Sequence, residues 1–385
     1  MDINTKKEMK NKLHDFFQKK VRKILPEYES KRKKAAIMQS IFILPFIFSI
    51  LLILGKYLPQ PFGEKLMTLS LLGVFVSIIL LPIASSILGY KSNSKGKAGT
   101  IDHTLENELK QQYMKELIEI FLEDVKCGKN IEAIDEKNKT EHDYSRNVIN
   151  LGTLQKFQKR LKELNIFNTI PFLNINDCIA GTYKNSKIKI YEASTKPTTF
   201  MGTIFLLFTT IVLFMLLLPF FIILFPLTIW LIYKFLKGML HYAPFRGLII
   251  EFDFEKNFIH ETFFLERSSA AKKIKLNKKL YKRVKLESIY FEKQYQLYSN
   301  NQVESRYIFT PAFIEKINKI RDIYRTNKIR GSFKNNKFVL TINTNRDMFA
   351  LGNDFKETNY KTFLTFYEEM ISLLQLADEL KRYLK

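Results

Sequence analysis

The sequence has few of the residues on which extracellular and metal-binding proteins depend. Its 385 residues include five histidines and two cysteines, Cys127 and Cys178. The cysteines form no CxxC pair and have no histidine at ligand spacing, so the sequence indicates neither a disulfide framework nor a zinc site. P-loop, GxGxxG, GxSxG and HExxH motifs are also absent. We therefore expect reduced thiols, no metal, no cofactor and no catalytic set.

Apolar and charged residues are segregated along the chain. Hydrophobic residues make up 46% of the sequence, yet its formal net charge is +23. Three blocks contain no charged residue: Ala35–Leu54, Leu66–Leu88 and Phe200–Tyr233. A stretch of about 20 apolar residues matches the hydrocarbon core of a bilayer, roughly 30 Å thick, at 1.5 Å per residue. The pattern predicts a chain that is partly membrane-spanning and partly basic and water-exposed.

The positive charges suggest how the apolar blocks are oriented. The run Lys31, Arg32, Lys33, Lys34 precedes the first block, and lysines also follow the second block. Because positive residues gather at the cytoplasmic ends of spans, the first two blocks are expected to form a hairpin with both ends in the cytoplasm. The third block would measure roughly 51 Å as one straight helix, which exceeds the hydrocarbon core. We expect a second hairpin there, hence four spans, although one long span or a re-entrant loop stays open.

An apolar stripe precedes the first block. Its members recur at spacings of three and four, as on one face of a helix: Leu13, Phe16, Phe17, Val21, Ile24 and Leu25. Pro26 is expected to end this helix. Two interpretations are equally supported, namely a helix lying on anionic lipid and a helix packed on the rest of the protein.

The rest of the chain mixes helical and strand patterns. Helices are predicted at residues 101–125, 151–164, 311–324 and 360–384, with a loop at 126–144. Strands are predicted at 178–183, 188–191, 247–254, 258–265, 295–298, 306–309, 329–333 and 338–342. Turn signals at Lys184–Lys187, Lys256–Asn257 and Asn335–Asn336 would join three hairpins.

These patterns predict an α+β fold class: transmembrane helical hairpins with a cytoplasmic mixed domain of antiparallel β-hairpins and packing helices. A pleckstrin-like sandwich is compatible with it. The predicted organisation is a basic amphipathic helix (1–34), a transmembrane hairpin (35–88), a helical region with the first β-hairpin (89–199), an inserted hydrophobic hairpin (200–236) and a cytoplasmic α+β domain (237–385).

The stretch Phe291–Pro311, which reads FEKQYQLYSNNQVESRYIFTP, resembles the signature of an uncharacterised bacterial family, the domain of unknown function numbered 3137. Leu25–Ala35, Asp177–Ile188 and Phe245–Phe258 are similar to the same family. The resemblance implies an N-terminal transmembrane pair, a cytoplasmic α+β domain and no known activity.

Two departures from the family pattern stand out. Its members pass directly from the strands near Tyr191 to those near Gly247, so Phe200–Tyr233 is an insertion. If both strand pairs share one sheet, the insertion must leave and re-enter on the same side. The family more often has acidic residues where this chain has Asn300 and Asn301, which weakens a metal or acid–base role.

The candidate signature-motif residues are Tyr298, Gln302, Glu304, Arg306 and Tyr307. On the predicted strand Glu304 and Arg306 lie two positions apart, so they would share a face and either bind a ligand or, as we favour, form a structural ion pair. We interpret Tyr295, Tyr298 and Tyr307 as packing residues rather than base-stacking ones.

The most basic segment spans residues 272–285. Its charged members are Lys272, Lys273, Lys275, Lys278, Lys279, Lys282, Arg283 and Lys285. Together with Lys31–Lys34 they are the candidate contacts to an anionic membrane surface, each contributing about 1 kcal/mol near that surface. Nucleic acid could use the same charges, but no nucleic-acid fold motif is present. A solvated basic loop is an equally supported alternative.

We therefore expect a multi-pass protein of the bacterial inner membrane, with both termini cytoplasmic. The expected function is a non-enzymatic, membrane-anchored binding or scaffold module that contacts anionic lipid. A small transporter or channel component is the alternative, and a membrane-bound enzyme comes third. The scaffold interpretation leaves room for a protein partner that the sequence does not identify, and nucleic acid is disfavoured.

Overall fold

The computed structural model describes most of the chain outside its apolar blocks. The described residues are 1–30, 58–87, 104–129, 131–134, 142–143, 151–167, 173–195, 245–267, 279–344 and 359–384, with isolated residues between these ranges. They form two compact units. Residues 121–349 and 368–385, with Met1, form the sheet unit, and residues 2–120 and 350–367 form the helical unit.

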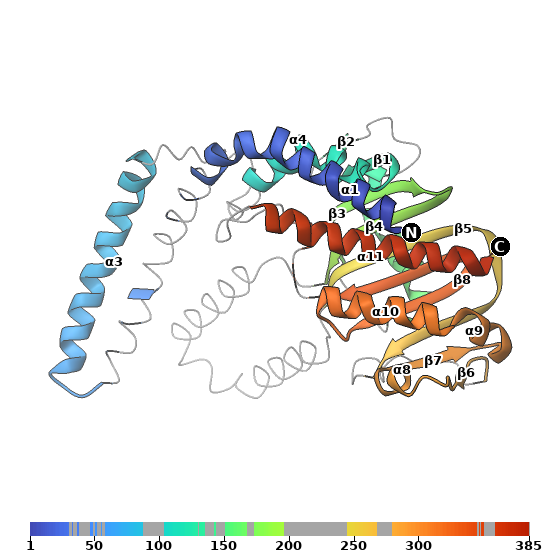
Figure 1. The fold of residues 1–385 in the computed structure, drawn as a ribbon. Helices are drawn as coiled ribbons and strands as arrows, with labels where there is room; N and C mark the ends of the chain where they lie inside the picture. Colours follow the sequence, from blue (N-terminus) through green and yellow to red (C-terminus); the bar gives the residue numbers. More distant parts are fainter. Residues whose placement is uncertain are drawn as a thin grey trace. The chain divides into compact units, whose positions relative to one another are not determined.

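The sheet unit contains one mainly antiparallel sheet (Figure 1). Its strands are β1 (Glu123–Gly128), β2 (His142–Asp143), β3 (Asn174–Tyr183), β4 (Ser186–Ser194), β5 (Arg246–Glu266), β6 (Lys282–Val284), β7 (Tyr295–Ser299) and β8 (Ile329–Asn343). The order is β2-β1-β3-β4-β5-β7-β6, and β8 pairs with β5. Among the strand pairs that the structure describes, only the short β1–β2 pair is parallel. The strand pair β3–β4 turns at Lys184 and Asn185, both at positive φ, which confirms the first predicted hairpin.

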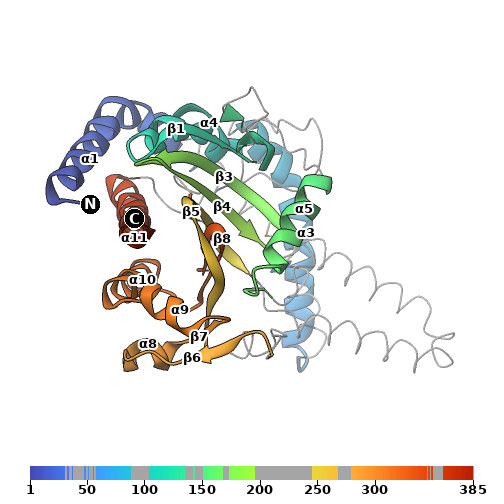
Figure 2. The same cartoon turned by 90° about the vertical axis from the view of Figure 1, so that its right-hand side faces the viewer.

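Helices cover both faces of the sheet (Figure 2). Helix α5 (Leu151–Lys162) lies on one face, while α10 (Pro311–Tyr324) and the second half of α11 (Tyr360–Leu384) lie on the other. The short helices α8 (Ile289–Gln294) and α9 (Gln302–Ile308) share the α10 side. A single sheet covered on both faces replaces the pleckstrin-like sandwich that we considered from the sequence.

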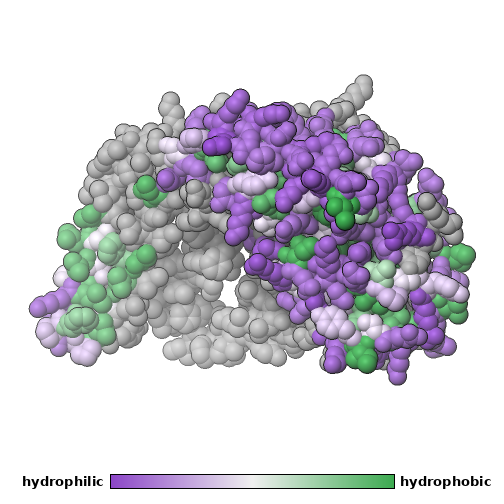
Figure 3. All heavy atoms as spheres, viewed as in Figure 1, coloured by the Kyte–Doolittle hydropathy of each residue, from purple (hydrophilic) through white to green (hydrophobic). Residues whose placement is uncertain are grey.

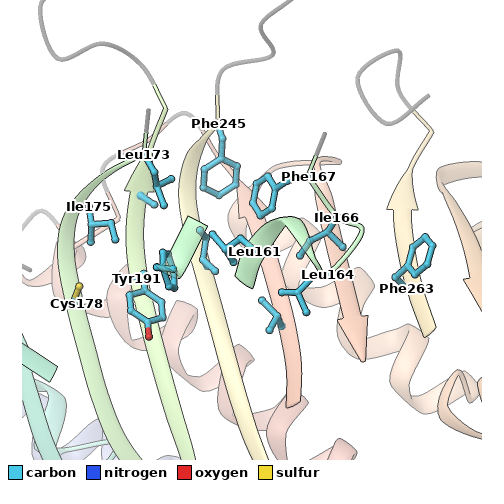
Figure 4. Close-up of a cluster of buried hydrophobic side chains, with 14 of the residues drawn as sticks. Leu161, Leu164, Ile166, Phe167, Leu173, Ile175, Cys178, Tyr191, Phe245 and Phe263 are labelled. Carbon is cyan, nitrogen blue, oxygen red and sulfur yellow. The ribbon is translucent and has the colours of Figure 1, made fainter. Parts of the chain in front are cut away.

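Each face has its own hydrophobic core. Under α5, Phe157 packs on Tyr191 with ring centroids 4.7 Å apart, and Leu161 and Ile249 are fully buried in the same cluster (Figure 4). The opposite face carries a chain of stacked and edge-on phenylalanines: Phe252, Phe264, Phe291, Phe309, Phe313, Phe333 and Phe338. Each of these rings buries a large apolar surface, so this face has a substantial aromatic core.

Strands β5 and β8 are two long strands where the sequence predicted two hairpins. The predicted turns at Lys256–Asn257 and Asn335–Asn336 lie inside β5 and β8, and Phe258 pairs with Asn335. Both turn signals therefore lie at the same break in the hydrogen-bonding register between two otherwise continuous strands. The prediction of hairpins here is wrong because each turn-like pair sits at a bulge, where extra residues leave the ladder.

The strands that flank the insertion are adjacent. Ser194 at the end of β4 pairs with Arg246 at the start of β5. Beyond this pair, the Thr195 N–H donates to the Phe245 carbonyl at 2.7 Å, and the Phe245 N–H donates to Thr195 Oγ1 at 2.6 Å. The insertion therefore leaves and re-enters the sheet side by side, as expected. The inserted block 200–236 itself lies outside the described residues.

Several other predicted elements can be compared with the structure. Helices α5, α10 and α11 are confirmed. The helix predicted at 101–125 is α4 (Thr104–Glu119), and β1 follows it. The loop predicted at 126–144 contains part of β1, a 3-10 turn η3 (Ile131–Ile134) and β2, because short strands at a sheet edge carry little periodic signal.

In the helical unit, α1 (Ile3–Phe16) continues through a π-helical turn η1 (Phe17–Val21) into helical residues 22–30. Pro26 therefore does not end the helix. Four members of the apolar stripe are buried (Leu13, Phe16, Phe17 and Val21), and Ile24 and Leu25 are half-buried. The Phe16 ring lies 6.1 Å from the Tyr113 ring, and the Phe17 ring lies 5.2 Å from the Phe363 ring. Packing on the protein, rather than contact with lipid, accounts for this stripe.

The predicted second span corresponds to helix α3 (Phe62–Ile87). Its first three turns contain Glu64, Lys65, Thr68 and Ser70, and the Ser70 hydroxyl donates to the Leu66 carbonyl at 2.6 Å. Among the helices that the structure describes, none is both long enough and apolar enough to cross a membrane. This finding overturns the predicted transmembrane hairpins and the multi-pass inner-membrane localisation with cytoplasmic termini. Most of the first apolar block, residues 35–54, lies outside the described residues.

Candidate functional site

The signature stretch folds into a capped turn between β7 and α9. Ser299 ends β7, and its hydroxyl lies 2.9 Å from that of Thr262 on β5. The same hydroxyl donates to the Asn301 carbonyl at 2.8 Å. Asn301 then caps the N-terminus of α9, because its side-chain oxygen accepts from the backbone N–H groups of Val303 and Glu304 at 2.9 and 3.2 Å. Asparagine is among the preferred residues for such a cap, so this part of the signature has a structural role.

Helix α9 sets the relative orientation of the signature side chains Glu304 and Arg306. Residues 306–309 were predicted as a strand, but they begin within α9, so Glu304 and Arg306 are about 200° apart around a helix and do not share a face. Glu304 faces β5, with its Oε2 4.0 Å from His260 Nε2. Arg306 and Gln302 are exposed. The Asn301 cap explains why strand-like alternation was misleading here.

The signature tyrosines also separate. Tyr298 stacks on Phe263, with centroids 5.6 Å apart and planes 19° apart, and Tyr295 is fully buried. Both confirm the interpretation as packing residues. Tyr307 does not, because 72% of it is exposed on the outer side of α9.

The basic segment is described only from Lys279 onward. Lys272, Lys273, Lys275 and Lys278 lie outside the described residues. Strand β6 pairs with β7 through Lys282–Ser299 and Arg283–Tyr298, which fixes this segment beside the signature turn. Val284 is buried, whereas Leu280 is 50% exposed.

We call the exposed positive rim of this region the basic edge. Its members are Lys279, Lys282, Arg283, Lys285, Lys293 and Arg306. Arg283 is partly neutralised, because its guanidinium lies 2.7 Å from Glu292, which also accepts from the Leu286 N–H at 3.2 Å. Lys282 and Lys285 are exposed and form no ion pair within the part of the chain that the structure describes. Residues 279–308 include six basic and three acidic residues, so this stretch has a net positive charge.

The N-terminal basic run is not part of this site. Of its four members only Lys33 is described, and it is exposed. Lys31, Arg32 and Lys34 lie outside the described residues. Lys33 belongs to the helical unit, whereas the described part of the 272–285 segment belongs to the sheet unit.

Exposed apolar residues accompany the basic edge. We call Ile259, Leu280, Val303 and Tyr307 the apolar tip. Their elements are held together by contacts: His260 lies near Glu304 of α9, and the Tyr281 hydroxyl donates to the Glu261 carboxylate. Figure 3 shows hydrophobic and hydrophilic residues intermixed over the end of the sheet unit that carries α8 and β7.

Two ion pairs of the sheet unit, each with a buried carboxylate, were not predicted from the sequence. Arg160 of α5 contacts Glu251 of β5, whose side chain is 1% exposed, and burial raises the pKa of Glu251 against the opposing effect of Arg160. Arg330 binds Glu266 through two bonds of 2.7 Å and donates a third to the Ile166 carbonyl at 2.7 Å. The available signal was a carboxylate within or at the end of an otherwise apolar strand.

The described cysteines lie on adjacent strands without facing each other. Cys127 of β1 pairs with Ile179, and Cys178 pairs with Gly128, so the two thiols point to opposite faces of the sheet. Burial raises the pKa of Cys178 well above its ordinary value. Neither cysteine forms a disulfide, and no group of three or more His, Cys, Asp or Glu in the described ranges could hold a metal ion.

One family model matches part of the chain. The family model described as "Protein of unknown function (DUF3137)" matches residues 243–382. The match includes the similar stretches Phe245–Phe258 and Phe291–Pro311, and it does not reach Leu25–Ala35 or Asp177–Ile188.

Other comparisons add little. No curated protein matches the chain. Among solved structures, the crystal structure of the mycobacterial trehalose monomycolate transport factor A, TtfA, is similar at 8% identity over 55% of this chain and 75% of that chain, with a TM-score of 0.28. A similarity this low supports no argument about fold or function. The long strand β5, the basic edge, the signature turn, helix α10 and all but the last two residues of α11 fall within residues 243–382, the range that is similar to the family described as protein of unknown function DUF3137.

Proposed function

We propose that this protein is a non-enzymatic binding or scaffold module that attaches through its basic edge to the anionic headgroups of a lipid surface. The observation that carries the proposal is the pair Lys282 and Lys285, which are exposed and form no ion pair within the described residues. Lysines held within a Debye length of an anionic surface contribute about 1 kcal/mol each.

The architecture supports a fixed rather than a flexible contact. Lys282 lies on β6, which is hydrogen-bonded to β7, and Lys285 follows directly after this strand. Glu292 holds the next residue, Leu286, through its backbone N–H at 3.2 Å. The lysine backbones are therefore ordered before binding, so only the side chains lose freedom on contact.

Two lysine substitutions test the proposal in the full chain. We expect Lys282→Gln together with Lys285→Gln to weaken binding to vesicles of phosphatidylcholine mixed with phosphatidylglycerol by about 2 kcal/mol, roughly thirtyfold. The measured quantity is the difference in binding free energy between these vesicles and vesicles of pure phosphatidylcholine. This difference cancels any contribution of the apolar blocks that is common to both kinds of vesicle. The matched control is Lys156→Gln with Lys159→Gln, two exposed lysines of α5 on the opposite face of the sheet.

The outcomes separate lipid from other anions. Equal binding by the edge variant and the control would overturn the proposal. If duplex DNA of the same charge concentration displaces the protein from the vesicles and binds it more tightly, the edge is a nucleic-acid site and the lipid proposal fails. Loss confined to the edge variant, with weaker binding to DNA, supports the proposal.

A further inference from the structure

We infer that the apolar tip, formed by Ile259, Leu280, Val303 and Tyr307, enters the hydrocarbon boundary of the lipid surface that the basic edge binds. This inference rests on the proposed function, and it identifies a second mode of contact. A charged rim alone would hold the protein at the headgroups. Apolar side chains that project beside it would add a contribution that salt does not screen.

The apolar tip projects because of the way β5 is built. Between the pairs Asp253–Lys337 and Thr262–Phe333, β5 spans nine positions and β8 only four. The additional residues leave the ladder as a bulge, and Ile259 in this bulge is 83% exposed. Bulges are known to redirect side chains away from a sheet.

Helix α9 adds the next two members. Val303 and Tyr307 are four positions apart, so they share one face of the helix, and they are 65% and 72% exposed. The buried residues of the same helix, Ser305 and Ile308, hold its other face against the sheet unit. The exposure of Val303 and Tyr307 is therefore fixed by the Asn301 cap and the packing of α9.

Lipid is the occupant that fits this surface best. The four side chains are 50–83% exposed, so they stand out from the surface and do not line a groove. A fluid lipid boundary accepts projecting side chains without a complementary shape, whereas a protein partner would need pockets for them. Arg306 lies between Val303 and Tyr307 in the sequence, and Lys279 and Lys282 flank Leu280, which matches an anionic rather than a neutral surface.

A tryptophan placed in the tip tests insertion directly. In a Trp230→Phe background of the full chain, Tyr307→Trp should show a blue shift on addition of phosphatidylglycerol-containing vesicles and quenching by lipids brominated on the acyl chains. The control is Gln155→Trp, at an exposed position of α5, which should show neither effect. Separately, Val303→Ser with Tyr307→Ser should weaken binding to these vesicles about tenfold at high salt.

The outcomes distinguish the two proposals. Binding that depends on phosphatidylglycerol without quenching of Trp at position 307 would overturn insertion and leave headgroup binding intact. Absence of such binding would overturn both. Emission that is already blue-shifted without vesicles, and that changes with protein concentration, would mean that a second copy covers the tip, and insertion would fail.

Discussion

Phe258 of β5 pairs with Asn335 of β8 in the middle of the region where β5 has the extra residues that form the bulge. Asn335 has a φ of 56°, in the left-handed region that asparagine tolerates and branched residues do not. The Phe258 ring packs edge-on against Phe333 at 5.1 Å. This pair therefore joins the phenylalanine core to the bulge that carries Ile259.

Substitution of Asn335 should reveal the strain at this bulge. We expect Asn335→Val to lower the free energy of unfolding by about 1–2 kcal/mol, because a branched side chain is unfavourable at positive φ. Asn335→Gly should be nearly neutral. The control is Asn336→Val, which is not at positive φ. Urea unfolding measures the differences, and equal effects of the two valine variants would contradict this account of the bulge.

The asparagines of the signature turn give a second matched pair. Asn301 caps α9, whereas the Asn300 side chain is exposed. Asn301→Ala should cost about 1 kcal/mol of stability, and Asn301→Asp should retain the cap. Asn300→Ala should change stability little. If Asn300→Ala destabilises the protein as much as Asn301→Ala, the cap is not the role of this position.

Glu369 on α11 should make stability depend on pH. Its side chain is 8% exposed, and burial raises its pKa to about 7 although Arg346 lies 3.6 Å away. An ordinary glutamate titrates near pH 4.3. Because the folded protein holds this proton more tightly than the unfolded chain, the contribution of Glu369 to stability falls as the pH rises from about 4.5 to 7.

Glu369→Gln should remove this dependence. Relative to the wild type, the variant should gain roughly 2–3 kcal/mol of unfolding free energy between pH 4.5 and 8. Glu315→Gln is the control, because the Glu315 side chain is 72% exposed. Thermal unfolding across this pH range measures the difference, and a constant difference between Glu369→Gln and wild type would show that Glu369 is ionised in the folded state.

Removal of one partner from the buried pair of Arg330 and Glu266 should lower the free energy of unfolding strongly, whereas replacement of both partners by apolar residues should lower it little. Arg330→Met leaves the 4%-exposed Glu266 carboxylate without its main partner, so we expect a loss of about 3–5 kcal/mol. The double variant Arg330→Met, Glu266→Met should recover most of this loss, because an apolar pair needs no desolvation of charge. Urea unfolding of the single and double variants gives the coupling energy between Arg330 and Glu266. Losses of unfolding free energy that simply add in the double variant would contradict this account of the pair.

Local patterns in the sequence predicted some parts of this fold well. Helices α10 and α11 have strong 3.6-residue periodicity, and the turn at Lys184–Asn185 has residues that accept positive φ. The β5–β8 ribbon was predicted as two hairpins because a bulge and a turn use the same residues. Only the non-local pairing of Phe258 with Asn335 distinguishes them.

The candidate site could be predicted only in part. The lysines of the basic edge were visible as a charge run, and the signature stretch was visible as a family resemblance. The exposure of Tyr307 could not be predicted, because this exposure depends on the Asn301 cap and on a helix where the sequence predicted a strand. Ile259 fell within the predicted strand 258–265, and its exposure follows from the bulge, which the sequence analysis did not predict. The apolar blocks predicted membrane spans, which the described helices do not support.

The most direct test of lipid binding is the dependence of vesicle binding on lipid charge. The full chain is titrated with vesicles in which the fraction of phosphatidylglycerol rises while total lipid is constant, for the wild type and for Lys282→Gln with Lys285→Gln. The wild type should bind more tightly with each increment of anionic lipid, and the variant should respond much less. Identical dependence in both proteins, or none in the wild type, would contradict the assignment of the basic edge as the lipid-binding surface.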